Sequence, residues 1–183
     1  MSVIYTWGST AQERSDDFAC DRYVTAPNGS CFRAVDVAAP VQQTFRWLCQ
    51  LRVAPYSYDW LDNRGRRSPR RRDPQLEKLA RGQSVMRIFR LVDFEPDRHI
   101  TLLCATTKVF GDLAVTYTVR PGPLGSRIVV KLVFRLGDRP VMRWLLPPGD
   151  LIMMRKQLLT LKRLAEREHA QAARASAARF EPA

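Results

Sequence analysis

Apolar and polar residues alternate along two segments of the chain, 113–120 and 127–136. Such alternation is typical of strands with one buried face. The apolar positions are Leu113, Val115, Tyr117 and Val119 in the first segment, and Ile128, Val130, Leu132, Phe134 and Leu136 in the second. Arg127, Lys131 and Arg135 fall on the opposite face. The pattern predicts a sheet with one dry face and one wet face.

Three more segments read as strands, at 31–38, 85–94 and 99–106, and short turn-like connections join the later ones. These connections favour hairpins, so the sheet should be antiparallel. Pro40 suits the first position of a helix, and Val41, Phe45 and Leu48 follow at helical spacing, which predicts a helix to about residue 51. Residues 53–82 predict only short helices or loops.

A long helix is predicted after Pro147, Pro148 and Gly149, with Asp150 as its N-cap. Its apolar stripe is Leu151, Met154, Leu158, Leu161 and Ala165. The chain then divides into an N-terminal extension at 1–28, one domain at 29–170, and an Ala/Arg-rich tail at 171–183 that we expect to be disordered. The extension should pack on the domain, because Tyr5, Trp7 and Phe18 are costly to expose.

The chain is basic, with a formal net charge of +12. Half of this charge comes from a run of six arginines between Arg64 and Arg72 that contains no acidic residue. Such a run can bind phosphates or can be a solvated loop. Gly65, Ser68 and Pro69 interrupt it, no aromatic residue interleaves it, and no known nucleic-acid module surrounds it. The solvated loop is favoured, so nucleic acid is not an expected partner.

The location of the protein follows from what its sequence lacks. No signal-peptide pattern begins the chain, and Arg143 and Asp150 interrupt the best membrane candidate, 141–154. We therefore expect a cytoplasmic protein. Its four cysteines form no CxxC pair and should be reduced, mostly buried thiols, with no metal or cofactor expected.

Three stretches of this sequence resemble the START-like, or SRPBCC, superfamily, and in particular its polyketide cyclase/dehydrase-like bacterial members. They are RAVDVAAPVQQTFRWLCQL, YSYDWLDN and MMRKQLLTLKRLAE, in the order found in that superfamily. The resemblance covers residues 30–170. It implies an α+β helix-grip fold, in which a curved antiparallel sheet wraps a long C-terminal helix around a cavity for lipids, steroids or polyketides.

That fold predicts the candidate ligand-binding residues, although for any single one of them ordinary core is the more common role. They are Tyr58, Trp60, Phe89, Val115, Tyr117, Val130, Leu132, Phe134, Met154, Leu158 and Leu161. Binding of a hydrophobic small molecule is the first expectation. A cyclase/dehydratase-like enzyme is the second, and an adaptor that binds nucleic acid or an acidic surface through residues 64–72 is the third.

Catalytic residues cannot be assigned, because the chain lacks the common hydrolase, nucleotide-binding and metalloprotease motifs. For an enzyme, polar residues near the expected cavity would orient a carbonyl or move a proton. They are Tyr58, Asp59, Arg87, Arg90, Asp93 and Tyr117. His99 should lie at the surface of a hairpin and His169 in solvent.

Overall fold

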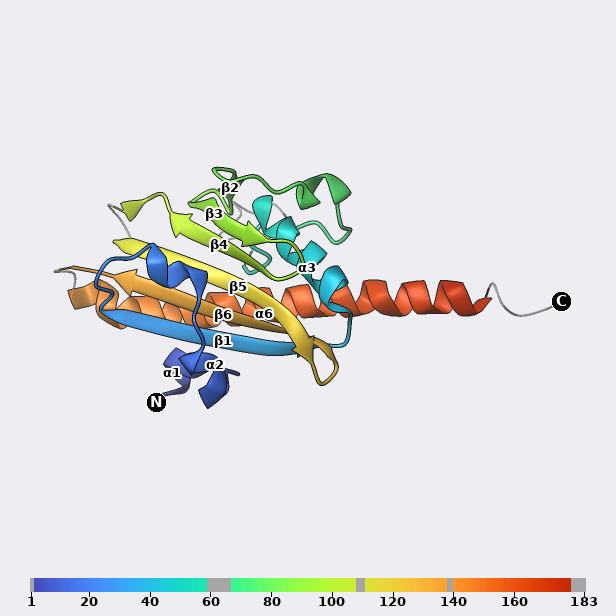
Figure 1. The fold of residues 1–183 in the computed structure, drawn as a ribbon, viewed down its shortest axis with the longest axis horizontal. Coiled ribbons are helices and arrows are strands. Elements are labelled where there is room, and N and C mark those ends of the chain that lie inside the picture. Colours follow the sequence, from blue (N-terminus) through green and yellow to red (C-terminus); the bar gives the residue numbers. More distant parts are fainter. Residues whose placement is uncertain (1, 59–66, 108–110, 138–139, 179–183) are drawn as a thin grey trace.

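The computed structural model describes residues 2–58, 67–107, 111–137 and 140–178. Its centre is a six-stranded antiparallel sheet in the order β1-β6-β5-β4-β3-β2. The strands are β1 Gly29–Val37, β2 Ser84–Val85, β3 Phe89–Glu95, β4 His99–Cys104, β5 Asp112–Gly122 and β6 Gly125–Arg135. One long helix, α6 (Pro140–Ala178), runs along the sheet and projects past it (Figure 1). The α+β helix-grip class predicted from the sequence is confirmed.

The two alternating segments form the central hairpin, β5 with β6, in which Tyr117 pairs with Val130. Their predicted apolar face is buried in the main core, together with residues from α6. The first strand in the chain, β1, pairs with the last, β6. This closure brings the N-terminal part of the domain against the hairpin that precedes α6.

The predicted strand at 85–94 is wrong, because the chain reverses within it. Met86 and Arg87 adopt positive φ angles of 46° and 66°. The Met86 N–H donates to the Leu51 carbonyl at 3.1 Å, which holds the turn against the segment after α3. Strands β2 and β3 therefore pair with each other, and Met86 of the turn between them packs against the main core.

The helix predicted after Pro40 is present as α3 (Val41–Cys49), continued by the 3-10 turn η2 (Gln50–Arg52). Pro40 stands at the N-cap, one position before the helix begins. Phe45, Trp47 and Leu48 are buried. In the described parts of the segment 53–82, residues 53–58 and 67–82, there is one further 3-10 turn, η3 (Pro74–Glu77), in agreement with the predicted short helices or loops.

Helix α6 begins ten residues before its predicted start, so Asp150 lies inside the helix and is not its N-cap. Pro147 and Pro148 also lie inside it, although proline removes helical N–H donors. The buried Arg33 of β1 donates to the Pro147 carbonyl at 3.3 Å. Tertiary contact thus supports the helix where its sequence is least favourable. The tail expected to be disordered is helical as far as Ala178.

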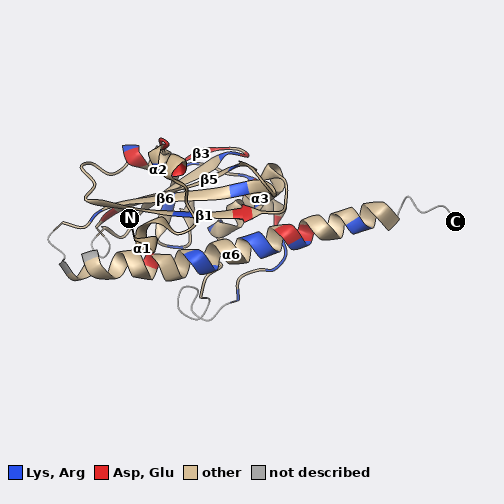
Figure 2. Cartoon of the chain, turned by 90° about the horizontal axis from the view of Figure 1, so that it is seen from below, with Lys and Arg blue, Asp and Glu red and all other residues tan. Residues whose placement is uncertain are grey.

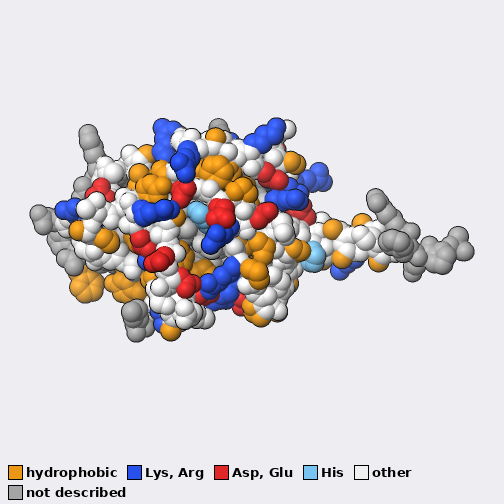
Figure 3. All heavy atoms as spheres, in the orientation of Figure 1, with side chains coloured by type: hydrophobic (Ala, Val, Ile, Leu, Met, Phe, Trp, Pro, Cys, Tyr) orange, Lys and Arg blue, Asp and Glu red, His pale blue; other side chains and the backbone are white. Residues whose placement is uncertain are grey.

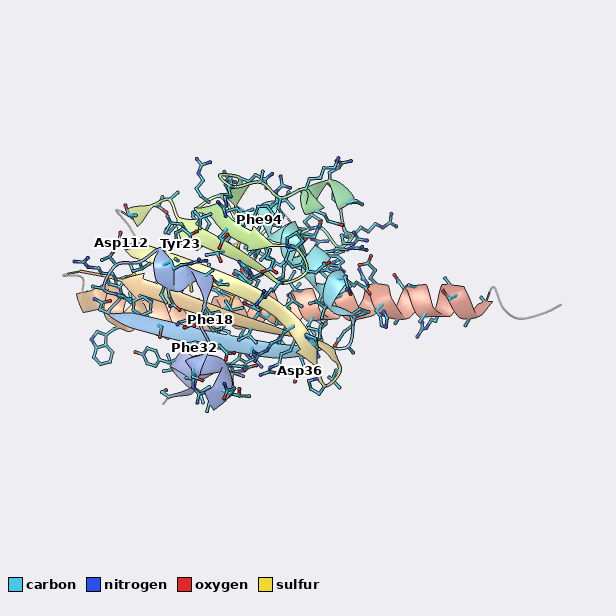
Figure 4. The ribbon with its side chains drawn as sticks, viewed as in Figure 1. Phe18, Tyr23, Phe32, Asp36, Phe94 and Asp112 are labelled. Atoms are coloured by element: carbon cyan, nitrogen blue, oxygen red, sulfur yellow. The ribbon has the colours of Figure 1, made fainter. Side chains whose placement is uncertain are left out.

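The prediction of one wet face is also wrong, because the N-terminal segment covers part of the outer face of the sheet. Its short elements are α1 Val3–Thr6, α2 Ala11–Ser15 and η1 Ala19–Arg22. Phe18 packs edge-on against Phe32 of β1 with ring centroids 6.1 Å apart (Figure 4). A second apolar cluster forms there, made of Phe18, Cys20, Val24, Phe32, Ala34, Ala114, Val129 and Val133.

Close approach of this segment to β1 requires glycine at position 8. Gly8 has φ +74°, and an added Cβ would stand 2.1 Å from the Ala34 carbonyl oxygen. The Ala34 N–H donates to the Trp7 carbonyl at 3.0 Å. A larger residue would clash with the backbone of the strand.

An ion-pair network ties the same segment to the central hairpin. Glu13 is 1% exposed and pairs with Arg127 at 2.6 Å and with Arg120. Arg127 also pairs with Asp36 of β1 at 2.8 Å. Burial alone would raise the pKa of Glu13, but the hydrogen bonds from Arg127, the Thr10 backbone and Arg120 outweigh it and lower the pKa to about 2.

No helix in the described part of the chain is long and apolar enough to cross a membrane. The cytoplasmic location stays a prediction. All four cysteines are free and buried, as expected, and none of them forms a disulfide.

We predict that Glu13→Gln lowers the free energy of unfolding by about 3 kcal/mol, because it leaves two arginines facing a neutral side chain. The lowered pKa of Glu13 means that its contribution is present above about pH 4.5 and disappears as the pH falls toward 2. Urea unfolding of both proteins at pH 7 and near pH 2.5 measures the difference. Asp17→Asn, an exposed acid of the same segment, is the matched control. Equal stability of the two variants at pH 7 would contradict the role of this network.

Candidate ligand cavity

A cavity of about 420 Å³ lies between the sheet and the first half of α6. Its wall is predominantly apolar, and its polar side chains are Ser57, Tyr117, Asp150 and Gln157. The sheet and the turn before β3 contribute Met86, Ile88, Phe89, Cys104, Leu113, Val115 and Leu132. Helix α6 contributes Met142, Leu145, Leu146, Gly149, Met153 and Met154. Ile88 and Leu145 are 37% and 60% exposed, so they mark the mouth.

The two halves of α6 contact the sheet differently. In the second half Leu158 and Leu161 are 0% and 1% exposed and belong to the close-packed core. In the first half Gly149 leaves room, because a Cβ added there meets no atom within 4 Å. The helix therefore closes one end of the fold tightly and leaves the other end hollow.

Five of the predicted ligand-binding residues line this cavity, namely Phe89, Val115, Tyr117, Leu132 and Met154. Four others, Val130, Phe134, Leu158 and Leu161, are buried in the main core and are not part of the wall. Tyr58 is half-buried and outside the wall, and Trp60 lies outside the described residues. Periodicity finds the inward face of an element but cannot tell which stretch of it borders a void. Whether the five bind a ligand stays a prediction.

Methionine is the signal that the sequence analysis used too little. Four of the five methionines in the chain, Met86, Met142, Met153 and Met154, line the cavity. Their flexible, polarizable side chains adapt to ligands of irregular shape. Only Met154 was predicted. Met86 lies in an unexpected turn, Met142 lies in a part of α6 that was predicted to be outside the helix, and Met153 lies off the predicted apolar stripe.

Asp150 carries the most unusual electrostatics of the wall. Its carboxylate Oδ2 lies 2.7 Å from a guanidinium nitrogen of Arg33, which is itself 1% exposed. Burial raises the pKa of Asp150 from 3.8 to about 6, and the charge and hydrogen bond of Arg33 offset only part of that rise. A carboxyl group with a raised pKa of about 6 therefore faces the cavity.

Tyr117 and Gln157 form a second polar pair in the wall. The Tyr117 hydroxyl donates to Gln157 Oε1 at 2.7 Å, and Gln157 Nε2 donates to the Pro55 carbonyl at 2.7 Å. Burial raises the pKa of Tyr117, so its hydroxyl remains a proton donor. These bonds join α6, β5 and the segment after η2 around the void.

The other polar residues proposed for an enzyme do not gather at the cavity. Arg87 and Arg90 are exposed, and Asp59 lies outside the described residues. Asp93 is on the outer face, because a bulge between Leu91 and Asp93 changes the side to which the strand presents its side chains.

Asp93 instead belongs to a surface cluster of charges. It pairs with Arg22 at 3.0 Å and with Arg81 at 3.1 Å, and His99 Nε2 lies 3.6 Å from its Oδ2. Acidic and basic side chains are interleaved on this face (Figure 3). His99 is therefore outside the cavity wall, but its side chain is only 18% exposed, so it is more buried than the sequence predicted.

The arginine run is only partly a solvated loop. Arg64 and Arg66 lie outside the described residues, and Arg67, Arg70 and Arg71 are exposed. Arg72, however, pairs with Glu77 and, at 3.2 Å, with Glu168 of α6. The end of the run is thus fixed to the helix, which composition alone did not indicate.

Comparisons with known proteins give structural similarity only. No family model matches the chain, and no curated protein matches it. A crystal structure of a protein from Mesorhizobium loti has 18% identity and a TM-score of 0.47, over 76% of this chain and 98% of that one. A Polyketide_cyc-like protein from Corynebacterium glutamicum has 15% identity and a TM-score of 0.43, over 76% and 92%.

The di-domain ARO/CYC protein StfQ from the steffimycin biosynthetic pathway is a third similar structure, with 10% identity and a TM-score of 0.47. The match covers 79% of this chain and 51% of StfQ. The helix-grip fold, which the START-like resemblance implied, is assigned from the strand order and the long helix of this chain itself.

We predict that Asp150→Asn removes a pH-dependent reduction in the free energy of unfolding. Because the pKa of Asp150 is raised, its contribution to stability is most favourable below pH 3.8 and falls as the pH rises through about 6. Urea unfolding should therefore show the variant gaining roughly 3 kcal/mol on the unmodified protein between pH 4 and pH 7.5. A stability difference that does not change over this range would contradict the raised pKa.

Proposed function

We propose that this protein binds a hydrophobic small molecule in the cavity between its sheet and the first half of α6. The observation that carries the proposal is the cavity itself, with about 420 Å³ of space and a wall whose described residues are apolar except at four side chains. Ligand sites typically enclose about 300–1,000 Å³ and combine an apolar lining with a few polar groups that fix orientation. This wall has that composition.

The polar groups are suited to a ligand that carries an oxygen function. Tyr117 and Asp150 present a hydroxyl and a carboxyl group to the void, and the Arg33 guanidinium stands behind the carboxyl. A carbonyl or hydroxyl of a lipid, steroid or polyketide would accept or donate a hydrogen bond there. Burial of the apolar surface of the ligand would then provide affinity, and the polar groups of the wall would orient the ligand.

We predict that the unmodified protein takes up N-phenyl-naphthylamine, an uncharged fluorescent probe, and that Gly149→Phe weakens this uptake at least tenfold. The new ring would enter open space beside the helix and occupy part of the cavity. Fluorescence titration measures the affinity.

Gly149→Ala is the control for the helix itself. It adds only a methyl group, so probe affinity should stay within about twofold, and stability should rise by about 0.5–1 kcal/mol because glycine is a poor helix former. Absence of probe binding by the unmodified protein would refute the proposal. Equal binding by all three proteins would place the probe elsewhere.

A cyclase/dehydratase-like activity is the second candidate, and the raised pKa of Asp150 favours it. A carboxyl group with a pKa of about 6 can give or take a proton at neutral pH, which is what general acid-base catalysis requires. Native mass spectrometry of the protein exposed to a lipid extract would identify a retained molecule. We predict that turnover of that molecule, if it occurs, falls at least a hundredfold in Asp150→Asn while its binding persists.

A further inference from the structure

A second hollow, of about 410 Å³, lies beside the apolar cavity. It is formed by residues 68–70 of the arginine run and by α6 between Lys156 and Arg167. We call it the cationic cleft. Four cationic side chains line it, Arg70, Lys156, Arg163 and Arg167, and Ser57 and Thr160 add hydroxyl groups. None of the described residues in its wall is acidic.

The cations of α6 meet because of helical spacing. Positions 156, 160, 163 and 167 are three or four residues apart and therefore share one face of the helix. Basic residues recur along α6 when it is viewed from below the sheet (Figure 2). Arg70 is held on this face, because Arg167 donates to its carbonyl at 2.7 Å and the neighbouring Arg72 pairs with Glu168.

These charges are not neutralised by the protein as described. Among the ion pairs formed between described residues, none includes any of the four cations. Four like charges around one hollow repel each other, and a bound anion would relieve this repulsion. Arginine side chains arranged in this way favour phosphate, which accepts several charge-assisted hydrogen bonds at once.

The cationic cleft and the apolar cavity are neighbours in the structure. Ser57 lines both of them. On α6, Gln157 borders the cavity while its neighbour Lys156 borders the cleft, and Met153 of the cavity is seven residues from Thr160 of the cleft. Seven residues of helix span roughly 10 Å, which is the separation that a molecule occupying both sites has to bridge.

We infer that the ligand is a phosphate-bearing amphiphile, whose apolar part lies in the cavity and whose phosphate lies in the cationic cleft. The inference rests on the proposed function, since the cavity must accept the apolar part. It assigns the second half of α6 and the described end of the arginine segment to recognition of the charged end. The same chemistry occurs in a soluble phosphate monoester and in the headgroup of an anionic lipid.

The test compares decyl phosphate with decanol as competitors for bound N-phenyl-naphthylamine, both at concentrations below micelle formation. The phosphate should displace the probe at about tenfold lower concentration than the alcohol of the same chain length. Raising the ionic strength should shrink this difference, because partly exposed charges are screened.

Paired variants locate the effect. Arg163→Gln should reduce the advantage of the phosphate severalfold, whereas Arg174→Gln, an exposed arginine farther along the same helix, should leave it within about twofold. Neither change should alter affinity for the uncharged probe. Equal displacement by decyl phosphate and decanol, with the probe bound normally, would overturn the inference while leaving the proposed function intact. Failure of the unmodified protein to bind the probe would instead refute the proposed function.

Two further arms identify the source of the phosphate. Displacement by decyl phosphate alone supports a soluble ester, and stronger displacement by phosphatidylcholine vesicles that contain phosphatidic acid than by vesicles without it supports a lipid headgroup. A single-stranded oligonucleotide should bind no more tightly to the unmodified protein than to Arg163→Gln. Oligonucleotide binding that depends on Arg163 and leaves decyl phosphate without an advantage would overturn the inference in favour of nucleic acid.

Discussion

The inner face of the sheet is an apolar surface that a single helix has to cover, and the arrangement of the molecule depends on how α6 does so. Leu158 and Leu161 are almost completely buried against the sheet, and they fix the second half of the helix at van der Waals contact. The first half carries Gly149 and flexible methionines and is held by the Arg33–Asp150 pair. The cavity is the space left between the sheet and α6, because packing fixes one part of the helix and polar contacts fix the other.

Polar contacts around an apolar void have a definite physical role. A buried guanidinium and carboxylate contribute little net stability, because desolvation cancels much of their attraction, but they fix geometry. The same holds for Tyr117, Gln157 and the Pro55 carbonyl, which connect three parts of the fold across the cavity wall. These contacts hold the wall of the cavity in one shape.

Much of the fold was predictable from sequence, because alternation in β5 and β6 and the stripe of α6 report directly which side chains are buried. The turn at Met86 was not predictable, since its positive φ angles are maintained by a hydrogen bond to the distant Leu51 carbonyl. The early start of α6 was hidden for a similar reason, because Arg33 supports Pro147 from another element. Local propensity predicts secondary structure that is determined by residues close in sequence. It does not predict structure that is imposed by tertiary contacts.

The same limit explains the partial success at the site. Val115 and Leu158 look alike in sequence, each on the inward face of its element, yet one borders the cavity and the other is solid core. The partial burial of the outer face of the sheet could have been predicted from the sequence. Ala114, Val129 and Val133 are apolar at the alternate positions of β5 and β6, a pattern that indicates burial on both faces.

The cluster around Phe18 and Phe32 has a consequence for how such a protein can change over generations. It stabilises the sheet from the face opposite the cavity, and Leu158 and Leu161 stabilise it from the middle of α6. Substitutions in the wall of the cavity therefore act on a small part of the total folding free energy. The residues of the cavity wall can therefore diverge one at a time while the scaffold that presents the wall persists.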